Sequence, residues 1–248
     1  MVPVIIPLFG SVDQLNKCKQ HLNDQTVPVE IFVHDNNTDN IYFTAAINKG
    51  ISNYLDSDCK YMIILNQDMY LHPNAVEEMI KFMDANPECG IAMPIQLSSK
   101  HPETVTCAGG TQAFPYGIHL HGTLDDFGES KMIHWANGAC MILRKDMIRQ
   151  IGLMDENFML IGSDSDYSFT ARSRSWQVWM IASAQGIHDH GITTKTTDPE
   201  IEAIKVRDMY YFAIKWLNGN LYRDLADNGH AQTPEQIEEI INTYKKAL

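Results

Sequence analysis

Short apolar runs separated by longer polar segments mark the first hundred residues. Four runs have the length and composition of buried strands, at 2–8, 29–33, 61–65 and 90–94. Three segments between them carry apolar residues at helical spacing, at 11–22, 43–55 and 73–86. Regular alternation of strand and helix predicts a parallel sheet with right-handed crossovers and helices on its faces.

The pattern changes after residue 98. Residues 98–134 are rich in Gly, Pro, Thr and His, which predicts a long loop of the kind that often serves function. The rest predicts two strands, at 135–143 and from 177 to 182, and two short helices, at 146–151 and 167–175. Two further helices are expected at 202–217 and 234–247. We find no internal repeat or clean linker, so we expect one domain.

Two predicted strands end in polar groups. The run 61–65 stops at Asn66-Gln67-Asp68, and the run 29–33 stops at His34-Asp35. In an open α/β sheet, ligands bind beyond the carboxyl ends of the strands, and a carboxylate fixed there suits a hard divalent cation. The two strand ends therefore predict one polar crevice for a nucleotide and a metal. Either aspartate could instead simply stabilise a turn.

Three later features could carry chemistry. The cluster 163–166 contains Asp164 and Asp166 before a predicted helix; helix capping explains one of them, and a general base is the other interpretation. His188, after the strand from 177, could bind a metal or a phosphate or be structural. Lys195 and Arg207 could contact a diphosphate, or could be ordinary surface cations.

Composition narrows the classes of function. Lys and Arg number 19 and Asp and Glu number 31 among 248 residues, a net charge of −12, which argues against nonspecific binding of nucleic acid or anionic lipid. The five cysteines contain no C-x-x-C pair, so neither a zinc ribbon nor a disulfide framework is expected. We see no signal peptide and no run long enough to span a membrane, and we expect a cytoplasmic protein.

A series of motifs follows a definite order along the chain. The motifs lie at 4–7, 33–39, 45–50, 65–68, 137–144, 152–158, 162–166, 188–191 and 207–211. Together they resemble the family 2 glycosyltransferases, especially the branch of bacterial rhamnosyltransferases and O-antigen transferases. The resemblance implies an α/β protein of the GT-A fold, with a Rossmann-like, mostly parallel central sheet flanked by helices in a single domain. That domain would be 1–218, with a nucleotide-binding half at 1–97, an acceptor-binding and catalytic half at 98–218, and a helical extension at 219–248.

The resemblance also implies roles for individual residues. Asp164 would be the catalytic base, and Asp35 and Asn66 would bind the nucleoside. Asp68 and His188 would bind Mn²⁺ or Mg²⁺. Further contacts to the nucleotide-sugar would come from Pro7, Asn37, Asn48, Lys49, Gln67, Asn137, Gly138, Lys195 and Arg207.

The implied function is transfer of a sugar, with inversion, from a nucleoside-diphosphate sugar (a UDP-sugar favoured) to a hydroxyl of a glycan or other acceptor. Two alternatives stay open. One is a weakly active or inactive sugar-nucleotide or glycan binder, because Asn66 stands at the first position of the family's Asp-x-Asp motif and Ser163 where a Glu commonly precedes the base. The other is a sugar nucleotidyltransferase, although the glycine-rich basic loop of that class is missing after the first strand.

Overall fold

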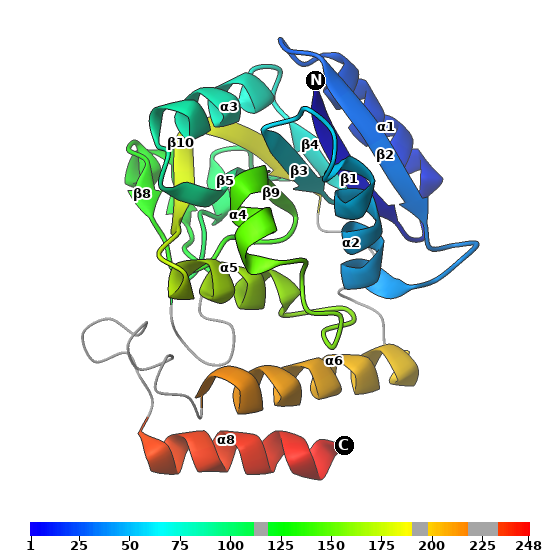
Figure 1. Cartoon of the computed structure of the whole chain (residues 1–248), viewed down its shortest axis with the longest axis vertical. Coiled ribbons are helices and arrows are strands. Elements are labelled where there is room, and N and C mark those ends of the chain that lie inside the picture. Colours follow the sequence, from blue (N-terminus) through cyan, green and yellow to red (C-terminus); the bar gives the residue numbers. More distant parts are fainter. Residues whose placement is uncertain (112–118, 190–197, 218–232) are drawn as a thin grey trace.

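The computed structural model describes residues 1–111, 119–189, 198–217 and 233–248 (Figure 1). The first elements are β1 (Val2–Leu8), α1 (Val12–Asn23), β2 (Val29–Asp35), α2 (Tyr42–Tyr54), β3 (Tyr61–Leu65), β4 (Met69–Leu71), α3 (Ala75–Ala85), β5 (Cys89–Ser98) and β6 (Thr104–Cys107). They are followed by β7 (Gly122–Thr123), the 3₁₀ helix η1 (Leu124–Phe127), β8 (Lys131–Met132), β9 (Cys140–Arg144), α4 (Lys145–Ile151), α5 (Ser163–Ser173), β10 (Gln177–His188), α6 (Pro199–Phe212), the π-helix η3 (Ala213–Leu217) and α8 (Pro234–Ala247).

The central sheet has the strand order β2-β1-β3-β9-β5-β10-β4. β1 pairs in parallel with β2 and β3, and β5 pairs in parallel with β10. β9 is antiparallel to β3 and β5, and β4 is antiparallel to β10. Strands β1, β2, β3, β5 and β10 therefore point the same way. The predicted α/β class, a mostly parallel sheet flanked by helices in one domain, is confirmed.

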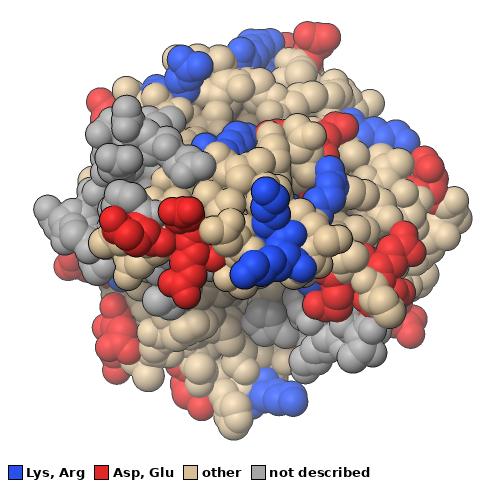
Figure 2. Space-filling model, turned by 90° about the horizontal axis from the view of Figure 1, so that it is seen from below, with Lys and Arg blue, Asp and Glu red and all other residues tan. Residues whose placement is uncertain are grey.

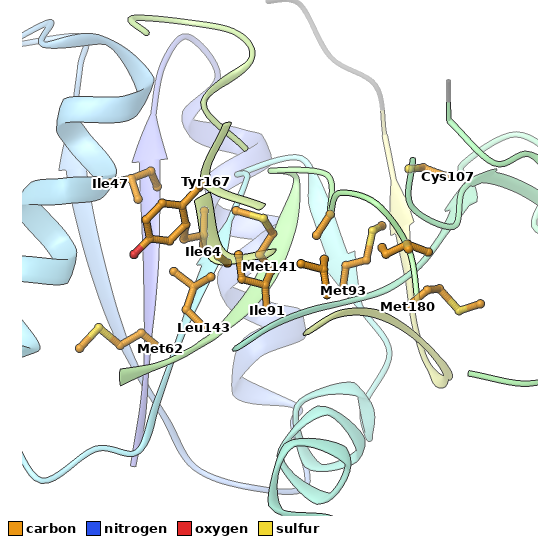
Figure 3. Close-up of a cluster of buried hydrophobic side chains, with 14 of the residues drawn as sticks. Ile47, Met62, Ile64, Ile91, Met93, Cys107, Met141, Leu143, Tyr167 and Met180 are labelled. Carbon is orange, nitrogen blue, oxygen red and sulfur yellow. The ribbon is translucent and has the colours of Figure 1, made fainter. Parts of the chain in front are cut away.

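Helices cover both faces of the sheet, and β3 shows why its sequence is apolar throughout. Ile63 and Leu65 belong to the core beneath α1 and α3. Met62 and Ile64 point to the other face, where they pack with Ile47 of α2 and other side chains from α4 and α5 (Figure 3). A strand buried on both faces has no position for a polar residue, so its sequence is a continuous apolar run.

Three predictions for the second half of the chain are wrong in extent. The strand expected at 177–182 runs from Gln177 to His188, so His188 is its last residue. The segment 98–134 is not one loop, because β6 pairs with the end of β5 and β8 pairs with β10. The strand predicted at 135–143 begins only at Cys140. Trp135 and Ala136 are apolar because they are buried beside α5, outside any long strand. An apolar run in the sequence does not distinguish residues buried within a strand from residues buried against a helix.

Three helix starts also differ from prediction by two residues or more. The helix expected from 202 begins at Pro199, with Asp198 at its N-cap. The helix expected from 73 begins at Ala75, with Asn74 at its N-cap, so Pro73 precedes the helix. The helix expected at 167–175 begins at Ser163. The polar cluster 163–166 is therefore its first turn, with Asp164 and Asp166 at the positive end of the helix dipole.

A third layer of helices packs beneath α5. In Figure 1, α6 and then α8 lie below it. Aromatic side chains from both layers, Phe169 of α5 with Phe212 and Trp216, form a separate core that Ile237 of α8 completes. The described part of the 219–248 extension is thus packed onto the domain.

The third layer is also joined to α5 by a buried ion pair. Lys215 Nζ lies 2.7 Å from Asp166 Oδ1 and 2.7 Å from Asp155 Oδ2. Trp216 Nε1 donates to the same Asp166 oxygen at 2.7 Å. Only 2% of the Asp166 side chain is exposed, so its charge depends on these partners.

The face formed by α8 carries charges of both signs (Figure 2). α8 has Glu235 in its first turn and Lys245 and Lys246 in its last, an arrangement that complements the helix dipole. In the described parts of the chain, no helix is both long and apolar enough to cross a bilayer.

Candidate active site

A pocket of about 450 Å³ opens where the carboxyl ends of β1, β3 and β10 meet the start of α5. Its polar wall includes Asn66, Gln67, Asp68, Asn137, Gly138, Asp164 and His188. Its apolar wall includes Pro7, Phe9, Phe43, Trp135, Leu160, Ile161 and Ile201. The fold therefore brings together many of the predicted site residues, although they lie far apart in the sequence.

Asp164 is fixed by two backbone donors. Gly138 N–H donates to Asp164 Oδ2 and Ser165 N–H donates to Oδ1, both at 2.8 Å. Burial raises the pKa of Asp164 above the ordinary value for aspartate, while these N–H groups act in the opposite direction. A positioned carboxylate of raised pKa that faces a pocket is suited to accept a proton from a bound hydroxyl.

Gly138 stands close to this carboxylate. A Cβ added at Gly138 would lie 3.3 Å from Asp164 Cβ and 3.3 Å from Asp164 Oδ2. Because the N–H of Gly138 is one of the two donors to Asp164, its lack of a side chain lets the backbone approach the carboxylate.

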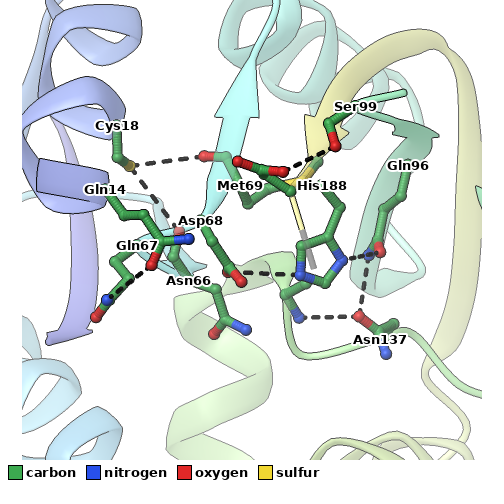
Figure 4. Close-up of polar contacts among 12 residues, drawn as sticks. Gln14, Cys18, Asn66, Gln67, Asp68, Met69, Gln96, Ser99, Asn137 and His188 are labelled. Carbon is green, nitrogen blue, oxygen red and sulfur yellow. Dashed lines mark hydrogen bonds and ion pairs between the residues drawn. The ribbon is translucent and has the colours of Figure 1, made fainter. Parts of the chain in front are cut away.

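Asp68 and His188 face each other across the pocket floor (Figure 4). His188 Nε2 lies 3.5 Å from Asp68 Oδ1, and only 10% and 14% of the two side chains are exposed. A carboxylate oxygen and an imidazole nitrogen are suitable ligands for Mn²⁺. The described residues contain no group of three or more His, Cys, Asp or Glu that could hold a metal ion. A cation held by this pair would complete its shell with other oxygens, from a bound molecule or water.

Two neighbours of Asp68 connect the strand ends. Gln67 accepts the N–H of Phe9 at 2.7 Å and donates to the Phe9 carbonyl at 2.9 Å, so it fixes the turn after β1. Asn66 N–H donates to the Ala139 carbonyl at 2.8 Å, which joins the end of β3 to the segment before β9. Both residues line the pocket, and these hydrogen bonds hold its wall in place.

The turn after β2 places different residues in the pocket from those predicted. Asp35 Oδ1 accepts the N–H of Asn37 at 2.9 Å, the Asx-turn that was the alternative interpretation of this aspartate. Asn37 Oδ1 in turn accepts the N–H of Gly10 at 2.7 Å. Asn36 and Asn40 of the same turn line the pocket, whereas Asp35 and Asn37 are not among its lining residues.

Three further predicted contacts also lie outside the pocket wall. Asn48 is buried, and its side chain bonds the carbonyl of Met154 at 2.8 Å and the N–H of Met154 at 3.0 Å, which ties α2 to the segment before α5. Lys49 is exposed on α2, and Arg207 is half exposed on α6. Lys195 lies outside the described residues. Their ligand roles stay predictions.

Asp208, the residue after Arg207, holds part of the pocket wall in place. Asp208 is fully buried and accepts the N–H groups of Leu160 at 2.7 Å and Ile161 at 3.0 Å. Because Leu160 and Ile161 line the pocket, α6 holds one wall through this carboxylate.

Sequence reasoning missed several residues at the site. Tyr42, His119, Trp135 and Lys205 line the pocket, and Gln96 bonds His188 from behind. One indication was available in the sequence: Gln96 is a long polar side chain near the end of the apolar run of β5. A buried amide in such a run needs polar partners.

Comparison by sequence gives no relatives: no protein-family model matches the chain, and no curated protein does. Comparison of structures does find similar proteins. GalNAc-T7, in a crystal structure with UDP, GalNAc and Mn²⁺, matches 98% of this chain with a TM-score of 0.65 at 9% identity. TarS of S. aureus matches 98% with a TM-score of 0.57 at 11% identity. Both neighbours are GT-A glycosyltransferases. The fold is GT-A.

The GT-A fold predicted from the motifs is thus confirmed by comparison of structures. The matches cover 55% of the GalNAc-T7 chain and 42% of the TarS chain, so this chain spans about half the length of its neighbours. At such low identity the likeness establishes the fold alone, and the activity has to be argued from the pocket.

Proposed function

We propose that this protein is a glycosyltransferase that moves a sugar, with inversion, from a nucleoside-diphosphate sugar to a hydroxyl of a glycan or other acceptor. A UDP-sugar is the favoured donor, and Mn²⁺ or Mg²⁺ the expected cofactor. The observation that carries this proposal is the joint placement of Asp164, held by two N–H groups, and the Asp68–His188 pair in one GT-A pocket. The narrower resemblance, to the family 2 rhamnosyltransferase branch, belongs to the same proposal.

The proposed roles follow from the chemistry of each group. Asp164 takes the proton from the acceptor hydroxyl as that oxygen attacks the anomeric carbon opposite the diphosphate. Asp68 and His188 hold the divalent cation, which when bound neutralises negative charge on the leaving diphosphate. The turn after β2, with Asp35 and its pocket-lining neighbour Asn36, binds the nucleoside.

The apolar wall serves a second purpose. Trp135, Leu160 and Ile161 face the same pocket as Asp164. Apolar side chains there exclude water from the reaction and so limit hydrolysis of the donor. Asp208 supports this role because it fixes the backbone of Leu160 and Ile161.

The alternative is a protein that binds a sugar nucleotide without turnover. Asn66 favours it, because this pocket residue adds no charge beside Asp68. The two proposals share a binding site and differ in whether the donor is consumed.

Thermal denaturation with nucleoside diphosphates tests the shared site. A ligand at 100 times its dissociation constant adds about 2.7 kcal/mol to the free energy of unfolding, which raises the Tm by about 5–10 °C in a chain of this size. We expect UDP with Mn²⁺ to give such a shift, and UDP or Mn²⁺ alone to give a smaller one. No shift with UDP, ADP, GDP or dTDP, with or without Mn²⁺, would contradict both proposals. Release of UDP from a UDP-sugar then separates turnover from binding.

Tyr42 provides a test of the nucleotide end of the pocket. Its φ of 62° is a conformation that bulky side chains rarely adopt, and such strain often marks a binding site. Tyr42→Gly relieves the strain at the cost of chain entropy, so we expect a free energy of unfolding within about 1 kcal/mol of the parent. Loss of an aromatic wall should weaken UDP binding, measured by calorimetry, by about tenfold.

Ser175→Gly is the matched control for Tyr42→Gly. Ser175 has a φ of 67° and does not line the pocket. It should show the same small change in stability with unaltered UDP affinity. Equal UDP affinity in the parent and in Tyr42→Gly would remove Tyr42 from the site.

A further inference from the structure

A line of polar side chains runs from the segment before β9 to the pocket floor (Figure 4). Ala139 N–H donates to Asn137 Oδ1 at 3.0 Å, and Gln96 Nε2 donates to the same oxygen at 3.0 Å. Gln96 Oε1 lies 3.0 Å from His188 Nδ1, and His188 Nε2 faces Asp68. Gln96 is 1% exposed, so these contacts satisfy its amide without solvent.

The direction of each bond in this line follows from its backbone end. A backbone N–H can only donate, so the Asn137 atom that meets Ala139 is the oxygen. Because that oxygen accepts, Gln96 presents its NH₂ group to it and its own oxygen to His188. An amide oxygen cannot donate, so His188 Nδ1 carries a proton.

The other end of Asn137 agrees with this orientation. Asn137 Nδ2 lies 3.5 Å from His119 Nε2, a ring nitrogen able to accept. With its oxygen toward Ala139 and Gln96, Asn137 has its NH₂ group on the side of His119. The contact with His119 is compatible with the orientation that the Ala139 N–H fixes.

A proton on Nδ1 determines what His188 Nε2 can bind. A neutral imidazole carries one ring proton, so with Nδ1 protonated Nε2 has only a lone pair. That lone pair faces Asp68 Oδ1 at 3.5 Å in a largely buried position. Two acceptors that face each other are stabilised by a cation between them. Metal-binding histidines are commonly oriented in this way, with the far N–H held by a protein acceptor.

We propose that Gln96, oriented by Asn137, is a positioning residue that holds His188 as the Nδ1–H tautomer and thereby presents Nε2, with Asp68, as a site for a divalent cation. This inference rests on the proposed function in one respect: the bound nucleotide is what would complete the coordination of the cation. The tautomer itself is a property of the protein alone.

Nitrogen NMR of the metal-free, ¹⁵N-histidine-labelled protein at neutral pH tests the tautomer, with the His188→Gln spectrum used for assignment. We expect the neutral imidazole of His188 in the parent to carry its proton on Nδ1. In Gln96→Leu, Nδ1–H loses its acceptor, and we expect the proton to move to Nε2, where it can bond Asp68. A parent spectrum in which the neutral imidazole of His188 carries its proton on Nε2 overturns the proposal even if no variant folds.

Binding of Mn²⁺, followed by the EPR signal of the free ion with and without UDP, tests the consequence. Loss of a partner behind a metal-binding histidine typically costs 10–100-fold in affinity, and we expect Gln96→Leu to lose about that much. Gln96→Glu keeps an acceptor for Nδ1–H and should recover part of the loss. Gln25→Leu, which removes an amide with three hydrogen bonds in the loop after α1, is the control and should bind as the parent does.

The outcomes separate this inference from the proposed function. If the parent shows the Nδ1–H tautomer and Gln96→Leu weakens Mn²⁺ binding, the inference stands even if no sugar is transferred. If sugar is transferred while Gln96→Leu leaves the tautomer and Mn²⁺ affinity unchanged, Gln96 has no positioning role and the proposed function survives.

Discussion

Asp164→Asn is expected to lower the rate of sugar transfer by about 10²–10⁴-fold, the usual contribution of a general base. Asparagine has nearly the same shape as aspartate but cannot take up the acceptor proton. It can keep one of the two bonds from Gly138 and Ser165, and loss of the other should cost about 1 kcal/mol of stability. UDP affinity should stay close to that of the parent, so the effect should fall on kcat.

The measurement is release of UDP from the donor in the presence of acceptor, with UDP affinity measured separately by calorimetry. Asp13→Asn is the matched control, because Asp13 holds the second position of α1 as Asp164 does in α5. That control should transfer sugar as the parent does. Equal rates for Asp164→Asn and the parent would show that another group takes the proton.

The pH dependence of the transfer rate is a second test of the role of Asp164. Burial raises the pKa of Asp164, and a base acts only when deprotonated. Activity should therefore fall as the pH drops through a pKa above the ordinary range of aspartate, and the acid limb of kcat/KM should be absent from the residual activity of Asp164→Asn.

Lys215→Met is expected to lower the free energy of unfolding by about 3 kcal/mol, because removal of one partner leaves the buried Asp166 carboxylate without its countercharge. In a chain of this size, that loss corresponds to a fall in Tm of about 6–12 °C. Denaturation in urea measures the change. Lys81→Met is the control: Lys81 is 59% exposed beside Glu77, and solvent screens such an exposed pair, so the substitution should change stability little.

The sign of the pH dependence of stability shows why Lys215→Met is less stable than the parent. Burial raises the pKa of Asp166, so the folded protein takes up this proton at a higher pH than the unfolded chain does. Without Lys215 the pKa should rise further, so the deficit of Lys215→Met should shrink as the pH falls from 8 to 5. Asp166→Asn in the same chain should restore part of the stability. A deficit that is the same at both pH values would mean lost packing and no charge effect.

The α/β class followed from local patterns, and the GT-A fold and most of the site residues were implied by the family resemblance. Strand β3 was predicted at its observed bounds, because burial on both faces leaves a continuous apolar run. The family resemblance implied that Asp68 and His188 bind one metal ion. Asp68 follows β3 and His188 ends β10, and strands that run in one direction end at the same edge of the sheet. The structure places the two side chains 3.5 Å apart.

The start of α5 shows where local pattern fails. Tyr167 faces the sheet core while Phe169 faces the layer of α6, so the helix is buried nearly all round and has little amphipathic periodicity. Without that periodicity, the polar residues of its first turn resemble a segment that precedes the helix. Burial between two layers is decided by how the layers pack, and the sequence of one helix does not carry it.

By itself the sequence determined the alternation of strands and helices, the α/β class, and the candidate roles of Asp68, Asp164 and His188, since these depend on periodicity and on motifs close in the chain. Only the tertiary structure decided which polar groups share the pocket. Asp35 and Asn48 use their side chains in a turn and a helix contact, whereas Gln96 reaches His188 across 92 residues of sequence. The physical reason is that a hydrogen bond forms between groups within about 3 Å in space, whatever their separation along the chain.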